Sequence, residues 1–281
     1  MSSPLVLLAA GMGTRFGGPK QLAEVGPRGE PLFAVTVAAA ATAGFDRFVL
    51  VTRAELEQRM REQVAAHLPG QPVEVVLQDV RSSGRARPWG TAHAVALCTE
   101  LDLPAFGVAN ADDVYGPGAL RCLAEGVRVA AERTVTIVGY RLGETLSAHG
   151  GVSRAVCELD DGGRVARLVE EHGLVADAEG PGVHGERGRC FRRDDPVSMN
   201  LFALPACVPG LLAERFAAFA AAHRDEPDAE YTLPTEVDRL RSDGLVEVRL
   251  AMTDEPWAGL THPAALAEVR RRLAQDPTSS L

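Results

Sequence analysis

The chain has 281 residues, of which 46% are hydrophobic and 24% charged, so it has the composition of a soluble globular protein with a large core. Its formal net charge of -9 argues against bulk attraction to nucleic acid or an anionic membrane, and any anionic ligand needs a local group of cations. The five cysteines include no C-x-x-C pair, which argues against a disulfide framework or a zinc knuckle.

The first half of the chain alternates short apolar runs with helical patterns. Apolar runs of strand length cover residues 5–9, 47–51, 73–77, 105–109 and 135–138. Helical patterns cover residues 31–43, 53–67, 91–100 and 117–131. Apolar strands separated by helices are typical of a parallel sheet covered on both faces, with ligands at the carboxyl ends of its strands. We therefore expect an α/β fold with a doubly wound, Rossmann-like, mostly parallel sheet.

The second half has a different, β-rich pattern. Residues 151–159 and 164–169 read as a hairpin, and the polar, Gly- and Arg-rich segment 177–195 reads as a mobile loop. Further strands are expected at 197–204 and 245–251, helices at 206–224 and 263–274, and a frayed tail at 275–281. This predicts one domain, 1–281, with a nucleotide-binding lobe at 1–145 and a smaller lobe at 146–281.

The first apolar run is short, lacks a basic flank and leads directly into a glycine loop. We therefore interpret it as a buried strand rather than a signal peptide. No apolar stretch approaches the roughly 20 residues that a membrane span needs. The expected location is the cytoplasm, with no membrane or nucleic-acid partner.

A glycine-rich loop with two cations follows the first strand. It reads Gly11-Met-Gly-Thr-Arg-Phe-Gly-Gly-Pro-Lys20, and Lys20 is the only lysine of the chain. Because all other Lys/Arg positions of the chain are Arg, the single lysine indicates a position where a compact ammonium is needed and a broad guanidinium does not fit. A site between phosphates is such a position. Glycines let backbone N–H groups approach phosphate oxygens, and Arg15 and Lys20 would neutralise their charge.

Two other phosphate-binding patterns fit this loop less well. The Walker pattern needs Gly-Lys-Ser/Thr, whereas Pro19 and Gln21 flank the lysine. The glycine spacing fits the dinucleotide fingerprint only in part, because the next strand ends at Thr52-Arg53 without an acidic residue for the ribose. The dinucleotide interpretation remains the weaker alternative.

Two further segments carry candidate ligands. Gly90-Thr91-Ala-His93 opens a helix, so its amides and the Thr91 hydroxyl would either bind a nucleotide or cap the helix, and His93 would orient that helix. Asp112 and Asp113 follow an apolar strand and lie at the same sheet edge as the glycine loop. Their oxygens suit Mg²⁺, which also bridges phosphates, although an Asx turn is the alternative for this pair.

Together these segments resemble the sugar-phosphate nucleotidyltransferase family, which includes glucose-1-phosphate thymidylyltransferase and N-acetylglucosamine-1-phosphate uridylyltransferase, over nearly the whole chain. The resemblance implies a GT-A-like fold with a sugar-binding lobe, a Mg²⁺ cofactor, and a nucleoside triphosphate (NTP) and a sugar 1-phosphate as substrates. It is compatible with a homo-oligomer.

The catalytic residues that the resemblance implies are Arg15, Lys20 and Asp112, with Asp112 holding the metal. The nucleotide-binding residues that it implies are Ala9, Ala10, Gly11, Gly13, Thr14, Gln78, Gly90 and Thr91. The substrate-binding residues that it implies are Gly151, Glu171, Ser198 and Asn200.

Three features depart from the family pattern. The Arg-rich stretch 81–89 is longer than the usual link between the nucleotide segments. The usual Glu-Lys pair of the sugar site is here Glu171-His172, which removes a permanent charge near the sugar phosphate. The second metal aspartate expected after a late tryptophan is absent from the segment 257–262, so either Asp113, a water or a phosphate fills that coordination, or metal binding is weaker.

The reaction that the resemblance implies is that of an NDP-sugar pyrophosphorylase. An oxygen of the sugar 1-phosphate attacks the α-phosphorus of the NTP, giving an NDP-sugar and pyrophosphate. The attacking phosphate is already a nucleophile, so catalysis would rest on positioning and charge neutralisation. A cytidylyltransferase for a non-sugar phosphate and a non-catalytic ligand sensor with the same fold are the alternatives. The long second half and Glu171 favour a sugar, and Gln78 favours a pyrimidine base.

Overall fold

The computed structural model describes residues 2–13, 16–78, 84–147, 150–177, 180–260 and 265–275. Four parallel strands in the order β3-β2-β1-β4 form one end of a mixed sheet, with β3 at its edge. They are β1 (Pro4–Leu8), β2 (Arg47–Thr52), β3 (Val73–Leu77) and β4 (Phe106–Asn110). Each agrees with its predicted apolar run to within one residue at either end, and the doubly wound α/β fold is confirmed.

Strand β11 (Pro196–Leu204) connects the parallel strands to the rest of the sheet. It pairs antiparallel with β4 near its end and with β7 (Val152–Leu159) near its start. It also pairs along its length with β6 (Thr134–Arg141), beyond which lies β12 (Glu247–Met252). The β11–β6 register shifts between Ser198 and Phe202, where Asn200 has a φ of 58°. Such a bulge redirects a strand and re-aims its side chains.

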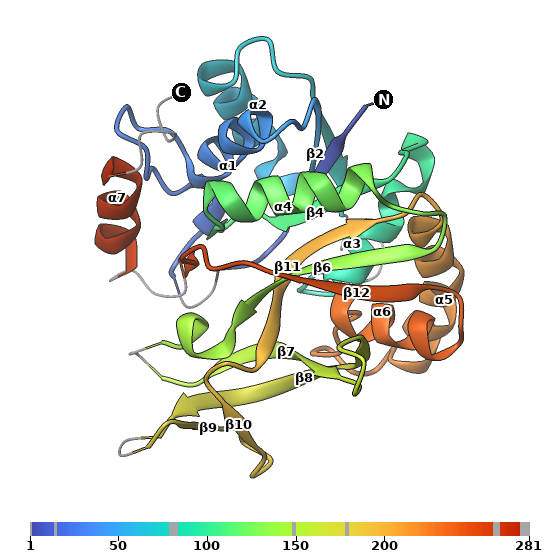
Figure 1. The fold of residues 1–281 in the computed structure, drawn as a ribbon. Coiled ribbons are helices and arrows are strands. Elements are labelled where there is room, and N and C mark those ends of the chain that lie inside the picture. The colour runs from blue at the N-terminus through green and yellow to red at the C-terminus, as the bar shows by residue number, and fades with distance from the viewer. Residues whose placement is uncertain are drawn as a thin grey trace.

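The lower part of the sheet in Figure 1 is antiparallel and runs in the order β7-β8-β9-β10. Its remaining strands are β8 (Val165–Ala176), β9 (Gly182–His184) and β10 (Cys190–Arg192). The expected loop over 177–195 is therefore wrong in part, because it contains a paired hairpin. The predicted boundary between lobes at residue 145 does not match the topology. Strand β11 pairs with β4 and strand β12 pairs with β6, so both join strands that precede residue 145.

Helices cover both faces of the sheet (Figure 1). One face carries α1 (Leu32–Thr42), α2 (Ala54–His67) and α4 (Pro117–Arg128). The other carries α3 (Thr91–Ala96), α5 (Val208–Ala222) and α6 (Leu233–Ser242), of which α6 was not predicted. The remaining elements are α7 (Ala265–Gln275), the 3₁₀ turns at Lys20–Leu22, Leu97–Leu101 and Leu142–Thr145, and the paired β5 (Asp113–Val114) and β13 (Ala258–Gly259). No helix in these described ranges is long and apolar enough to cross a membrane.

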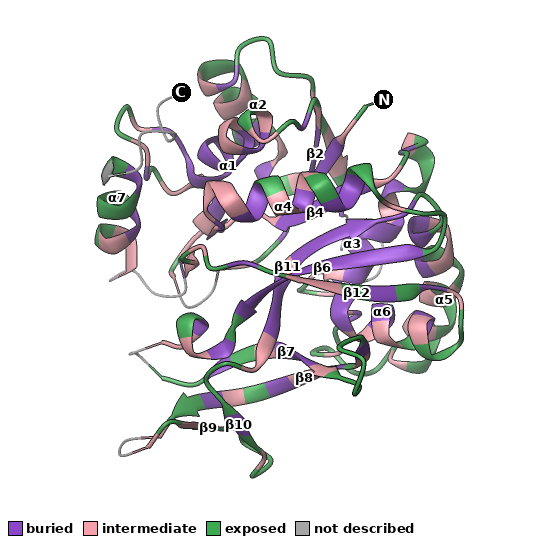
Figure 2. Cartoon of the chain, viewed as in Figure 1, coloured by how far each residue is buried: buried purple, intermediate pink, exposed green. Residues whose placement is uncertain are grey.

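The period of two along β1 separates the two cores. Leu5 and Leu7 pack with the cluster under α1, α2 and α4, while Val6 and Leu8 pack with the cluster over α3, α5 and α6. All four are at most 8% exposed, and Figure 2 shows the central strands as buried. Burial of each such side chain contributes about 1.5–3 kcal/mol, which fixes the strand whose carboxyl end leads into the glycine loop.

Candidate functional site

A cavity of about 630 Å³ lies at the carboxyl ends of β1 and β4, a size typical of small-molecule sites. Both halves of the chain contribute to its wall. The sequence-predicted residues that line it are Ala9, Ala10, Gly11, Gly13, Lys20, Gln78, Gly90, Thr91, Asp112, Ser198 and Asn200. Among the other predicted residues, Thr14 and Arg15 lie outside the described residues, so their roles stay predictions.

The glycine loop is held in place by its own backbone and by Gln21. Gly13 has a φ of 62°, and a Cβ there would lie 2.0 Å from the carbonyl oxygen of Gly18, so this position requires glycine. The backbone N–H of Phe16 donates to the carbonyl oxygen of Gly13. The buried amide of Gln21 donates to the carbonyl oxygen of Ala9 at 2.6 Å. The loop is thus fixed at the end of β1, beside the cavity.

Lys20 and Asp112 meet at the cavity, as the sequence predicted from their places at neighbouring strand ends. The distance from Lys20 Nζ to Asp112 Oδ2 is 3.6 Å, and the side chains are 18% and 34% exposed. At this distance and exposure the carboxylate orients the ammonium while both remain accessible to a ligand.

The two adjacent aspartates have different surroundings. Asp113 is 6% exposed, and its carboxylate accepts hydrogen bonds from Asn110 Nδ2 at 2.8 Å and from the Tyr115 hydroxyl at 3.3 Å. Burial, and then the charge of Asp112, raise the pKa of Asp113 to about 7. Burial also raises the pKa of Asp112, and the Lys20 charge opposes that shift. Asp113 therefore positions Asn110, whereas Asp112 is available to a ligand.

Asn200 continues this network to the other side of the cavity. Its Nδ2 donates to Asn110 Oδ1 at 3.3 Å, and its backbone N–H donates to Ser198 Oγ at 3.2 Å. Its Oδ1 is buried without a hydrogen-bond partner among the described residues. Leaving a buried acceptor unpaired costs about 1–3 kcal/mol, and the left-handed backbone adds strain. Asn200 is thus prepared to accept a hydrogen bond from a ligand.

The second predicted nucleotide segment forms part of the wall opposite the glycine loop. Gly90 has a φ of 116°, and a Cβ there would lie 2.6 Å from the carbonyl oxygen of Tyr231. The Thr91 hydroxyl accepts a hydrogen bond from the backbone N–H of Leu233 at 2.8 Å, so it caps α6 rather than its own helix. The segment therefore joins α3 to the start of α6, which the sequence did not reveal.

Gln78, which lines the cavity, and His93, which does not, both lie next to this wall segment. Gln78 is 2% exposed, and its amide nitrogen lies 2.9 Å from the carbonyl oxygen of Gly90 and 3.0 Å from His93 Nδ1. His93 stacks on Phe216 at 4.1 Å between ring centroids. Burial lowers the pKa of His93 to about 4, so the ring is neutral near pH 7 and Nδ1 accepts the Gln78 proton. The expected orienting role of His93 agrees with this geometry.

Because the pKa of His93 is about 4 in the folded protein and 6.5 ordinarily, the unfolded chain binds more protons between these values. The contribution of neutral His93 to the free energy of unfolding is therefore complete above pH 6.5. It is lost, by up to about 3 kcal/mol, as the pH drops through 4. We expect His93→Gln to flatten this dependence and His67→Gln to leave it unchanged. Urea unfolding between pH 8 and pH 4 measures both variants, and equal slopes for wild type and His93→Gln would contradict the assignment.

The donor set is compatible with the Mg²⁺ that the resemblance implies, and Asp112 would be its protein ligand. No group of three or more His, Cys, Asp or Glu side chains that could hold a metal occurs in the described part of the chain. Mg²⁺ between phosphates needs only one or two carboxylates, because waters and phosphate oxygens complete its shell. At Gly259 a Cβ would lie 2.8 Å from Asp113 Oδ1 and 2.5 Å from the Trp257 ring, so a second aspartate has no space there.

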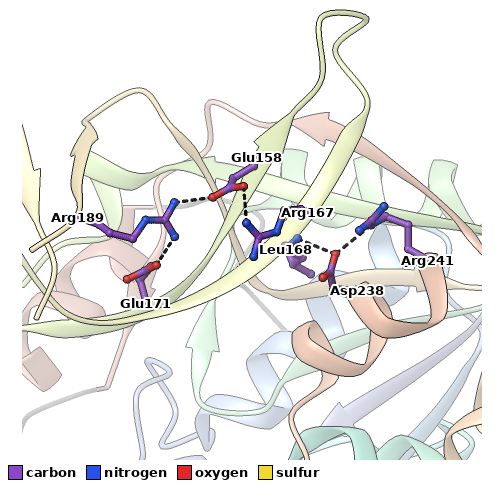
Figure 3. Close-up of polar contacts among 7 residues, drawn as sticks. All are labelled: Glu158, Arg167, Leu168, Glu171, Arg189, Asp238 and Arg241. Atoms are coloured by element: carbon purple, nitrogen blue, oxygen red, sulfur yellow. Dashed lines mark hydrogen bonds and ion pairs between the residues drawn. The ribbon is translucent and has the colours of Figure 1, made fainter. Parts of the chain in front are cut away.

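Glu170, rather than the predicted Glu171, lines the cavity. Adjacent residues of a strand point to opposite faces, and Glu170 Oε2 accepts a hydrogen bond from the Thr232 hydroxyl at 3.0 Å. Glu171 is 1% exposed and binds Arg189, which also binds Glu158 (Figure 3). The structure therefore brings Glu170 to the substrate wall and places Glu171 in an ion-pair network under the β9–β10 hairpin.

Gly151 is also outside the cavity wall. A Cβ at this position would lie 2.9 Å from the Cα of Gly173, so the glycine permits the close approach of the two backbones.

The sequence analysis missed Arg154, which lies on β7 and lines the cavity. The available signal was a single Arg within the mostly apolar run 152–157.

Comparisons with known proteins give the family and the fold. The family described as the MobA-like NTP transferase domain matches residues 5–176. The structure of the inositol-1-phosphate CTP transferase from T. maritima superposes with a TM-score of 0.67 at 16% identity, covering 96% of each chain. HddC from Yersinia pseudotuberculosis superposes with a TM-score of 0.61 at 13% identity, covering 96% of this chain and 99% of HddC. Curated proteins give no significant match. At these identities the two structures establish the fold.

Proposed function

The chain belongs to the MobA-like NTP transferase domain family and is a nucleotidyltransferase, and on that premise we propose that it transfers a nucleoside monophosphate to a sugar 1-phosphate. The observation that carries the proposal is that one cavity is lined on one part by groups suited to phosphates and on another part by groups suited to hydroxyls. Lys20, Asp112 and the glycine loop supply the groups that bind phosphates. Glu170, Asn200 and Thr232 supply polar side-chain groups suited to several hydroxyls.

The mechanism follows from positioning and charge. A phosphate oxygen of the acceptor attacks the α-phosphorus, the bond from that phosphorus to the bridging oxygen breaks, and pyrophosphate leaves with the electron pair. No side-chain base is needed, because the attacking oxygen is already ionised. Lys20 neutralises charge between the reacting phosphates, and Arg15 would hold the leaving phosphates. Mg²⁺ at Asp112 would supply further neutralisation of the α-phosphate when bound.

The hydroxyls of the sugar would bind to the wall formed by β8, β11 and the start of α6. Glu170 has one carboxylate oxygen paired with Thr232 and accepts further hydrogen bonds from substrate hydroxyls. Asn200 offers the unpaired Oδ1 and is fixed by Asn110. Two acceptors at defined places select the orientation of a hydroxylated ring.

We expect Glu170→Gln to raise KM for the sugar 1-phosphate about 10- to 100-fold, which corresponds to roughly 1.5–3 kcal/mol for hydrogen bonds to a charged group. KM for the NTP should hardly change. Glu171→Gln is the matched control, because it removes the adjacent carboxylate from the opposite face and should act on thermal stability instead. Steady-state kinetics on both variants measure the contrast. A rise in KM for the sugar 1-phosphate in Glu171→Gln, with no rise in Glu170→Gln, would show that Glu171 is the carboxylate that binds the sugar.

A cytidylyltransferase acting on a non-sugar phosphate is the second candidate. Its support is the structural likeness to the inositol-1-phosphate CTP transferase from T. maritima. A panel of four NTPs against sugar 1-phosphates, inositol 1-phosphate and alcohol phosphates, read by pyrophosphate release, decides between them. Turnover with a sugar 1-phosphate supports the first proposal, and turnover confined to CTP with a non-sugar phosphate replaces it by the second.

A further inference from the structure

We propose that Arg154 binds the phosphate group of the acceptor, as a second phosphate-binding cation in the cavity besides Lys20. The proposal rests on the proposed function and adds the residue that recognises the acceptor as a phosphomonoester. Arg154 lies on β7, within the antiparallel part of the sheet, whereas Lys20 follows β1. The two cations thus come from the two differently lined parts of the cavity.

The guanidinium of Arg154 is held in one orientation by neutral oxygens. Its Nε donates to the Thr145 hydroxyl at 3.1 Å, its Nη2 to the carbonyl oxygen of Thr145 at 2.5 Å, and its Nη1 to the carbonyl oxygen of Ser153 at 2.7 Å. The guanidinium carbon lies 4.9 Å from the centre of the Trp257 ring. Three of the five N–H groups are engaged, so two remain without a partner among the described residues.

Among the residues that the structure describes, no carboxylate forms an ion pair with Arg154. The charge of Asp113 acts on Arg154 through space. Burial lowers the pKa of Arg154 to about 10, so the group stays charged near pH 7. Arg154 is partly buried, a partly buried charge is stabilised by a charged partner, and a guanidinium with two free N–H groups matches two oxygens of a phosphate.

The place of Arg154 in the sheet assigns it to the acceptor rather than to the NTP. Arg154 lines the cavity directly beside Ala155, and Glu170, the cross-strand partner of Ala155, lines it as well. His172 is bonded to the Ser153 hydroxyl at 2.9 Å and does not line the cavity. Among the described residues of β7 and β8, Arg154 is therefore the cation that faces the acceptor wall.

The test compares Arg154→Met with Arg164→Met, a control that removes the same charge from the exposed turn of the same hairpin. We expect Arg154→Met to raise KM for the sugar 1-phosphate about 10- to 100-fold, to leave KM for the NTP within about twofold, and to be partly rescued by Arg154→Lys. The control should change neither constant. A rise confined to KM for the NTP, or no rise in either, would overturn the proposal.

A binding measurement keeps the proposal separate from the identity of the substrate. Inorganic phosphate, titrated calorimetrically into the wild-type protein, should bind at a site that Arg154→Met loses and Lys20→Met retains. In turnover it should compete with the acceptor. If no acceptor is turned over but this phosphate site is lost in Arg154→Met, the proposed function fails and the phosphate site stands. Loss in Lys20→Met only, or competition with the NTP only, would assign the phosphate to the glycine loop and overturn the Arg154 site.

Discussion

Replacing Lys20 by arginine is expected to lower kcat about a hundredfold while the protein remains folded. The ammonium of Lys20 lies 3.6 Å from Asp112 at the junction of the glycine loop and β4, where the proposed mechanism requires two phosphates to be held close together. A planar guanidinium of the same charge is broader and cannot occupy the same point. Loss of one such transition-state contact costs on the order of 3 kcal/mol.

The matched variant Lys20→Met separates the charge of Lys20 from its shape. It should lose at least as much turnover as Lys20→Arg, because neither charge nor geometry remains. Circular dichroism and thermal melting should be close to wild type for both, since the side chain contributes little to the core. Turnover near the wild-type rate in Lys20→Arg would remove the main argument for a compact charge between phosphates.

Asp112→Asn is expected to weaken the response to Mg²⁺ and to lower kcat about 100- to 1000-fold. Asp112 is the accessible carboxylate beside Lys20, whereas the Asp113 carboxylate is already bonded to Asn110 and Tyr115. Asp113→Asn should therefore disturb the placement of Asn110 and leave the apparent Mg²⁺ affinity little changed. Activity measured against Mg²⁺ concentration compares the two variants. A larger loss of Mg²⁺ affinity in Asp113→Asn would move the metal ligand by one residue.

The parallel half of the fold was predictable because its strands are short, mostly apolar runs and its glycine loop is contiguous in sequence. The proximity of Lys20 and Asp112 followed from the rule that neighbouring strand ends share one edge of the sheet. The strands and the two loops that carry Lys20 and Asp112 can each be recognised from a short stretch of sequence. The structure contains these strands and the contact between the two residues.

The acceptor side was less predictable because tertiary pairing determines it. The choice between Glu170 and Glu171 depends on which face of β8 meets the cavity, and a shift of one residue reverses the answer. The β9–β10 hairpin forms in a polar segment without an apolar alternation, so its strands gave no period of two. Arg154 was identified only from the structure, which shows a partly buried guanidinium beside the cavity with no carboxylate partner in the described part of the chain.

The measurement that tests the central claim most directly follows the label from two forms of NTP, one with ³²P at the α-phosphate and one at the γ-phosphate. Incubated with Mg²⁺ and the acceptor chosen from the substrate panel, the α-label should appear in a product joined to the acceptor. The γ-label should appear in pyrophosphate, in equal amount. Release of the γ-label as inorganic phosphate, or an acceptor product that carries the γ-label, would contradict nucleotidyl transfer at this cavity.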